Sequence, residues 1–208
     1  MTSPAPGADG RAPLLGRLSI DFAALTADLP SCSDPDVLGV ALLEALANWY
    51  AHEHGGCYLQ QFEQSGASYL FDLASAVGLP QEDRTVAAWA LTPDLVARRD
   101  ISYQRGFPML AAPEGPPVDR GHVIPHLSGG AFGPNIYRQD RALNRGWSEQ
   151  GKRYRALERE ATATPGTLFF GHLLYSDESA YPAEVEVGLM RGTALHVERF
   201  DNRPGPAP

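Results

Sequence analysis

Residues 119–147 read DRGHVIPHLSGGAFGPNIYRQDRALNRGW, and this stretch combines three kinds of reactive side chain. His122 closes an Asp-Arg-Gly-His run, and imidazole is the side chain best suited to proton transfer near neutral pH. Asn144 offers a neutral amide oxygen, a hard ligand that Mg²⁺ accepts together with several waters. Guanidinium groups suit phosphodiester oxygens. They are plentiful around these two positions, at Arg98, Arg99, Arg120, Arg138, Arg141 and Arg145.

The spacing of the polar residues in this stretch is more specific than any one of them. After Asp119-Arg-Gly-His come the Gly129-Gly130 pair and an Asn-x-x-x-Gln-x-x-x-x-Asn register formed by Asn135, Gln139 and Asn144. This pattern resembles the DNA/RNA non-specific endonucleases, which are ββα-metal or His-Me finger nucleases. The resemblance covers about residues 57–202, with residues 84–91 matching the family's central strand. It implies an α+β fold with a mixed or antiparallel central sheet, flanking helices and a ββα-metal active site.

The resemblance also implies a role for each matching residue. His122 would be the general base, and Asn144 would bind one Mg²⁺, with Mn²⁺ as an alternative ion. Arg120 would hold the scissile phosphate, together with Arg98 or Arg99, and Arg145 would contact the substrate. Structural roles at the site are implied for Asp119, Asn135 and Gln139. The implied substrate is DNA, with RNA as a second candidate, read through its backbone with little sequence specificity.

The glutamate that the family places soon after the metal-binding asparagine is displaced in this chain. Glu158 has the matching neighbours but follows Asn144 by 14 residues. In one continuous helix the two would lie about 21 Å apart, too far to share an ion. Three alternatives remain: the chain breaks at Gly146 or Gly151 and folds back, Glu149 takes the role, or no glutamate does. We favour Glu158 with a break.

The distribution of charge agrees with a phosphate-binding centre inside an acidic protein. The formal net charge is −8, which taken alone argues against a nucleic-acid partner. Residues 98–159, however, carry 11 of the 17 basic residues and a net charge of +5. Residues 1–97 carry −9 and residues 160–208 carry −4. The acids therefore lie mostly outside the proposed site and the arginines around it.

The rest of the chain predicts a helix followed by strands. Asp34 can cap a helix that starts at Pro35 and ends at Gly55 or Gly56, with an apolar face that packs in the core. Strand-like runs follow at 57–62, 68–73 and 84–91, and later at 167–175, 184–190 and 194–200. Alternation of glutamate and aliphatic residues predicts a half-buried strand at 184–190. Residues 140–162 predict a helical stretch interrupted by glycine.

These elements suggest four parts of the chain. Residues 1–13 and 203–208 predict disordered tails, 14–56 an acidic helical segment, and 57–202 the endonuclease-like domain. No apolar run reaches the roughly 18 residues of a membrane helix, and the N-terminus lacks a Sec-type signal. We therefore expect no membrane partner, and a cytoplasmic protein or one exported by another route.

The other histidines and the cysteines predict little chemistry. His126 lies four residues after His122, but Pro125 between them disfavours a helical zinc pair. His172 and His196 lie in predicted strands, where structural roles are expected. Cys32 and Cys57 match no metal or redox motif, and we expect reduced thiols, with a disulfide left open.

The pattern leaves the biological role and some alternatives open. A non-specific nuclease endangers its own cell, which favours a toxin or effector, or an antiphage-defence nuclease, paired with an inhibitor or immunity partner. One alternative is a catalytically weak nucleic-acid-binding or regulatory module. Another is a nuclease subunit of a larger complex, in which residues 14–56 dock a partner.

Overall fold

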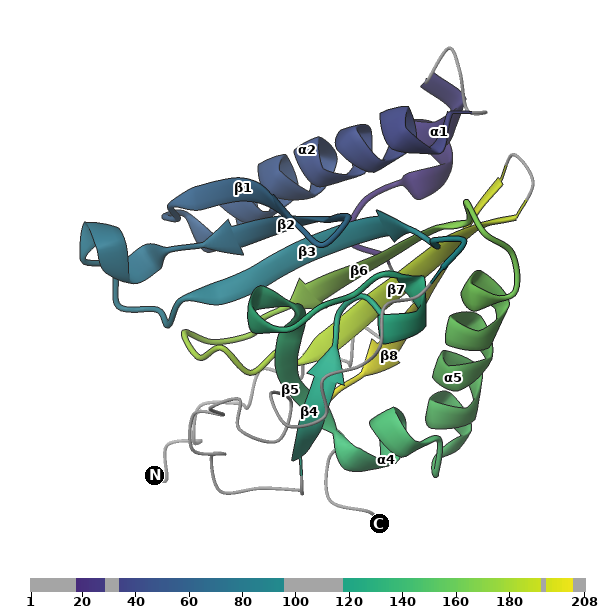
Figure 1. The fold of residues 1–208 in the computed structure, drawn as a ribbon. Helices are drawn as coiled ribbons and strands as arrows, with labels where there is room; N and C mark the ends of the chain where they lie inside the picture. The colour runs from purple at the N-terminus through teal and green to yellow at the C-terminus, as the bar shows by residue number, and fades with distance from the viewer. Residues whose placement is uncertain (1–17, 29–33, 96–117, 192–193, 204–208) are drawn as a thin grey trace, which may run out of the picture.

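A six-stranded antiparallel sheet forms the centre of the protein, in the order β1-β2-β3-β6-β7-β8 (Figure 1). The computed structural model describes residues 18–28, 34–95, 118–191 and 194–203. Every strand pair within these residues is antiparallel. The α+β class and the antiparallel form of the sheet are thus confirmed. The strands are β1 (Leu59–Gln64), β2 (Ala67–Asp72), β3 (Arg84–Leu91), β6 (Leu168–Leu174), β7 (Glu184–Arg191) and β8 (Ala194–Asp201).

One face of the sheet is covered by helix α2 (Pro35–His54), whose ends match the prediction. The Asp34 side chain accepts a hydrogen bond from the backbone N–H of Asp36, and Gly55 ends the helix in the left-handed conformation. Leu38, Leu42 and Leu46 of α2 are fully buried in the same core as β3. The described part of the acidic segment 14–56, which includes the short helix α1 (Phe22–Asp28), therefore belongs to the main core.

Strand β3 is buried on both faces, so the face of the sheet opposite α2 must also be covered. Seven of its eight residues are buried, as its apolar residues on both faces predict. Below the sheet in Figure 1 lie the two-stranded hairpin of β4 (Val118–His122) and β5 (Ile136–Asp140), then α4 (Arg141–Arg145) and α5 (Glu149–Thr162). Short 3₁₀ turns occur at Ala74–Val77, His126–Ser128 and Gly133–Asn135.

The expectation that β7 is half-buried is wrong. Glu186, predicted to face water, is fully buried. Its carboxylate accepts hydrogen bonds from the backbone N–H and the hydroxyl of Ser19, both at 2.6 Å, and lies 3.0 Å from His172 Nδ1. Alternation in the sequence could not show this, because the partners come from the N-terminal segment and from β6. His172 is structural, as expected.

This buried carboxylate predicts an acid-sensitive fold. Burial raises the pKa of Glu186, but the hydrogen bonds from His172 and Ser19 outweigh it and hold the pKa below its ordinary value of 4.5. A carboxyl with a lowered folded-state pKa stabilises the fold above its unfolded pKa and loses that contribution as the pH falls through the folded value. We expect Glu186→Gln to lower the free energy of unfolding by about 2 kcal/mol at pH 7. The variant should also flatten the loss of stability below pH about 4.5.

Urea unfolding of both proteins at several pH values measures this difference. Equal acid dependence of the two proteins would show that Glu186 does not cause the loss of stability at low pH.

No helix in the described ranges has the length and apolar character needed to cross a membrane.

Candidate functional site

The β4–β5 hairpin and α4 place the sequence motif in one compact unit. Asp119 pairs with Gln139 across the hairpin, Arg120 with Arg138, and His122 with Ile136. Helix α4 starts directly after β5, where the Asp140 side chain accepts a hydrogen bond of 2.7 Å from the backbone N–H of Leu143. Strand β5 therefore leads into α4 without an intervening loop, and Asn144 lies in the last turn of α4.

A pocket of about 510 Å³ gathers the main predicted residues. His122 and Arg120 reach it from β4, Asn144 from α4 and Glu158 from α5. The first and last of these residues, Arg120 and Glu158, are 38 positions apart in the sequence, so their meeting is a product of the fold. The remaining lining residues are Pro125, His126, Leu127, Arg155, Arg159 and Thr162.

A chain reversal at Gly146 is what brings Glu158 to Asn144. Gly146 has a positive φ of 70°, ends α4, and is followed by the Ser148 cap of α5. Helix α5 then runs through Gly151, which packs on α4 so closely that a Cβ would lie 2.4 Å from the Ala142 carbonyl oxygen. The predicted break thus falls at Gly146. Glu149 is exposed and pairs with Lys152, and it does not line the pocket.

Asp119 fixes the orientation of the Asn144 amide. The Asn144 Nδ2 donates to Asp119 Oδ2 at 3.2 Å, which leaves the Asn144 Oδ1 as the oxygen available to a cation. Arg141 and Arg145 also donate to this carboxylate, at 3.0 and 2.6 Å. Burial raises the pKa of Asp119, but the hydrogen bonds from Arg145, Asn144 and Arg141 outweigh it and lower the pKa. Asp119 is therefore an ionised anchor for α4.

Glu158 supplies a second oxygen donor in a shielded position. Its side chain is 18% exposed, and burial raises its pKa to about 7, opposed by Arg155 and Arg159. Its Oε2 lies 3.5 Å from Arg155 Nε. Within the described ranges, no three His, Cys, Asp or Glu side chains cluster closely enough to hold a metal ion. Asn144 and Glu158 nevertheless fit Mg²⁺, which uses hard oxygen donors and keeps several waters.

Asn135 and Gln139 shape the hairpin and do not line the pocket. Asn135 is fully buried and closes the loop between the strands by hydrogen bonds to Ile124 and Ala131. Gln139 packs over Gly121, where a Cβ would lie 2.5 Å from both the Cβ and Oε1 of Gln139. A Cβ on Gly130 would lie still closer to its neighbour, 1.8 Å from the Ile124 carbonyl oxygen. Steric fit thus explains why glycine stands at these two positions of the motif.

The structure distributes the arginines differently from the sequence expectation. Arg145, expected to contact substrate, is held by Asp119 and does not line the pocket. Arg98 and Arg99 lie outside the described residues. Arg155 and Arg159 do line the pocket, although they lie outside the motif at 119–147. Their spacing with Glu158 and Thr162 (i, i+3, i+4, i+7) puts all four on one helix face, which is the signal that could have found them.

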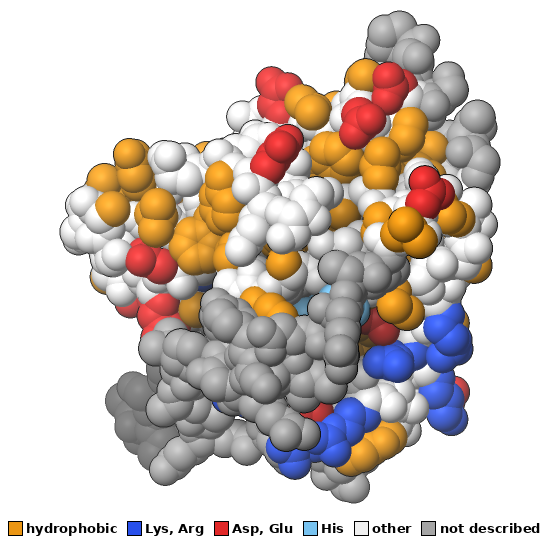
Figure 2. All heavy atoms as spheres, in the orientation of Figure 1, with side chains coloured by type: hydrophobic (Ala, Val, Ile, Leu, Met, Phe, Trp, Pro, Cys, Tyr) orange, Lys and Arg blue, Asp and Glu red, His pale blue; other side chains and the backbone are white. Residues whose placement is uncertain are grey.

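Basic side chains also gather on the surface around this site. Figure 2 shows Lys and Arg in the lower right of the view, over α4 and α5, and acidic side chains mostly above and to the left. The residues of these two helices that carry the positive charge are Arg141, Arg145, Lys152, Arg153, Arg155 and Arg159. Such a surface suits an anionic polymer.

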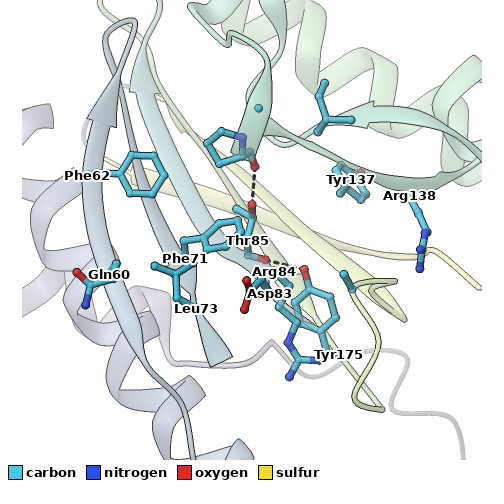
Figure 3. Close-up of a pocket in the computed structure, with 14 residues that line it drawn as sticks. Gln60, Phe62, Phe71, Leu73, Asp83, Arg84, Thr85, Tyr137, Arg138 and Tyr175 are labelled. Atoms are coloured by element: carbon cyan, nitrogen blue, oxygen red, sulfur yellow. Dashed lines mark hydrogen bonds between the residues drawn. The ribbon is translucent and has the colours of Figure 1, made fainter. Parts of the chain in front are cut away.

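A second cavity of about 430 Å³ lies between the sheet and the hairpin (Figure 3). Phe62, Phe71 and Leu73 line one side and Tyr137 the other. Its charged residues are already engaged: Arg84 donates to Tyr50 and to two backbone carbonyls, Asp83 accepts from Ser75, and Arg138 lies 3.7 Å from Glu82. This cavity is therefore an apolar space without a group set for catalysis.

The remaining candidates have modest roles. His126 lines the first pocket beside His122. His196 Nε2 lies 2.9 Å from Glu198 Oε1, two residues further along the same face of β8. Cys57 is a free, half-buried thiol whose pKa is raised by burial, and Cys32 lies outside the described residues.

Comparison of the chain with protein-family models and with curated proteins finds no match.

Proposed function

We propose that this protein is a Mg²⁺-dependent, sequence-non-specific endonuclease that hydrolyses phosphodiester bonds of DNA, with RNA as a second substrate. The observation that carries the proposal is the single pocket lined by His122, Asn144 and Glu158 together with arginines. Such a pocket offers a proton acceptor, hard oxygen ligands and phosphate-binding groups within one small volume.

In the proposed mechanism the side chains have separate tasks. His122 accepts the proton of the attacking water, which makes that water a better nucleophile. Arg120, Arg155 and Arg159 hold the scissile phosphate by charge-assisted hydrogen bonds. Asp119 is a positioning residue, because it orients the Asn144 amide through the hydrogen bond of 3.2 Å. These groups recognise the sugar-phosphate backbone, so cleavage depends little on base sequence.

Asn144 and Glu158 would hold the ion. When bound, Mg²⁺ would stabilise the negative charge that develops on the phosphate and on the leaving 3′ oxygen. The Asn144 oxygen would bind it directly, and Glu158 would bind it directly or through water. Mn²⁺, which accepts the same ligands, is expected to replace Mg²⁺.

Removal of the metal is the first test of this function. We expect the purified chain to degrade plasmid DNA in Mg²⁺ or Mn²⁺, and excess EDTA to abolish degradation, because the developing charge then lacks its counterion. Total RNA treated in parallel would show whether RNA is also cut. Binding without turnover in either ion would favour the alternative function of a nucleic-acid-binding or regulatory module.

Two of the three glutamates of α5, Glu158 and Glu149, provide a matched pair of variants. We expect Glu158→Gln to raise the Mg²⁺ concentration for half-maximal cleavage by about 10–100-fold, because it removes a negative ligand from the pocket. Glu149→Gln should leave it unchanged, since Glu149 is exposed and pairs with Lys152. Magnesium titrations of the initial cleavage rate measure both. A larger effect at Glu149 would reverse the assignment.

The biological role follows from the proposed lack of specificity. A nuclease that cuts any sequence would harm the cell that makes it, which favours a toxin or effector, or an antiphage-defence nuclease. An inhibitor or immunity partner, or restraint within a larger complex, would then protect the host. Because the described part of the N-terminal segment lies in the main core, deletion of residues 1–56 would disturb the fold as well as any docking.

A further inference from the structure

Trp147 is a large aromatic side chain that the protein leaves mostly in solvent, with 63% of its surface exposed. It precedes Ser148, the N-cap of α5, and its backbone N–H donates to the Ala142 carbonyl at 2.9 Å. An apolar residue at this position often packs against the fourth residue of the helix. Here that residue is Lys152, which is itself exposed and pairs with Glu149. The start of α5 therefore gives no reason for an indole.

The indole is nevertheless held in place by the network that holds Asn144. The Arg145 guanidinium lies 5.0 Å from the centre of the Trp147 ring, a cation–π contact. Arg145 in turn donates twice to Asp119, at 2.6 and 3.2 Å, and Asp119 also accepts from the Asn144 amide. Three successive contacts thus join the exposed ring to the candidate metal ligand.

The geometry points to Trp147 as a stacking platform for an unpaired base that flanks the scissile phosphate, so that the substrate class includes single-stranded or locally unpaired nucleic acid. This inference rests on the proposed function. An aromatic face beside arginines is the combination by which proteins bind single strands, because every base offers a π-face and the cations attract the backbone. In an intact duplex the bases already stack on one another, so the ring gains such a contact only where a base is unpaired.

The surrounding charge favours nucleic acid over a protein as the occupant. Arg141, Arg145 and Lys152 lie in the helices on either side of Trp147, on the basic surface over α4 and α5 (Figure 2). A nucleic-acid strand that passes the pocket would meet this surface next. A protein anchored at Trp147 remains an outcome that the test can detect.

The test compares binding of single and double strands in EDTA, where no cleavage is expected. Fluorescence anisotropy would use a labelled oligonucleotide of roughly 12 nucleotides and its duplex with the complementary strand. We expect Trp147→Ala to weaken single-strand binding by about tenfold and duplex binding by less than twofold. Trp147→Phe should restore most of the loss, because phenyl also stacks. Tyr58→Ala, which removes an exposed aromatic side chain just before β1, far from Trp147 in the sequence, should change neither affinity.

The outcomes separate this inference from the proposed function. If Trp147→Ala binds both nucleic acids as wild type does, or loses both equally, the stacking platform is overturned, even if the wild type still cleaves plasmid in Mg²⁺. If wild type binds neither nucleic acid and does not cleave, the proposed function fails first. If Trp147→Ala keeps its affinity for nucleic acid but no longer binds a purified protein partner, the inference is also overturned, in favour of a protein anchor.

Discussion

His122→Ala is expected to lower the initial rate of Mg²⁺-dependent plasmid cleavage by about 10²–10⁴-fold, the range that a general base contributes. The imidazole lines the pocket from the end of β4, and the alanine variant would leave the ion and the arginines in place without a proton acceptor. The fold should survive, because His122 is half-buried at the pocket and is not among the core residues. The expected signature is therefore loss of rate at nearly unchanged Tm.

A plasmid-nicking assay and a thermal unfolding curve on the same samples measure the two effects. His52→Ala is the matched control, since His52 is an exposed histidine at the end of α2 and should change neither quantity. Cleavage by His122→Ala at the wild-type rate would refute the mechanism. A large fall in Tm would leave His122 with a structural role.

Asn135→Ala is expected to have the largest effect on stability, a loss of about 2–4 kcal/mol in the free energy of unfolding. The Asn135 Oδ1 accepts from the Ile124 N–H at 2.8 Å, and its Nδ2 donates to the carbonyls of Ile124 and Ala131 at 2.9 and 2.8 Å. The side chain is fully buried, so alanine would leave these backbone groups without partners in a site closed to water.

Urea unfolding of the variant measures this loss, and Asn144→Ala is the control. Asn144 is partly exposed, and its side chain makes one hydrogen bond within the described part of the chain, to Asp119, so its variant should lose less than about 1 kcal/mol. Cleavage should show the opposite order, with Asn144→Ala inactive even where it is folded. If Asn135→Ala proves as stable as wild type but inactive, Asn135 belongs to the reaction and not to the loop.

Local signals predicted much of the fold. The capping residue Asp34, the first-turn Pro35 and the left-handed Gly55 set the ends of α2, because each satisfies backbone groups within a few residues. The apolar faces of residues 84–91 marked a strand covered on both sides, and that strand is β3. Glycine also marked the reversal at Gly146. All of these depend on interactions between near neighbours, which a sequence displays directly.

Long-range partners were the part that the sequence could not supply. The charge of Glu186 predicted a solvent-facing residue, yet Ser19 and His172 lie beside it in the folded protein and make its burial possible. Arg145 carried the same charge as the pocket arginines, but Asp119 holds it away from the pocket. A residue type states what a side chain can bind; only the fold decides which partner is within reach.

The motif at 119–147 shows where this division lies. Its residue types and spacing by themselves gave the chemistry: an imidazole, an amide oxygen and guanidinium groups suited to a phosphate and a hard cation. The tertiary structure decided which of these groups share a pocket, by reversing the chain at Gly146 and packing Gly151 against α4, so that Glu158 lines the same pocket as Asn144. Backbone turns and close packing bring residues that are distant in the sequence close together in space. Both depend on the whole core and not on the motif alone.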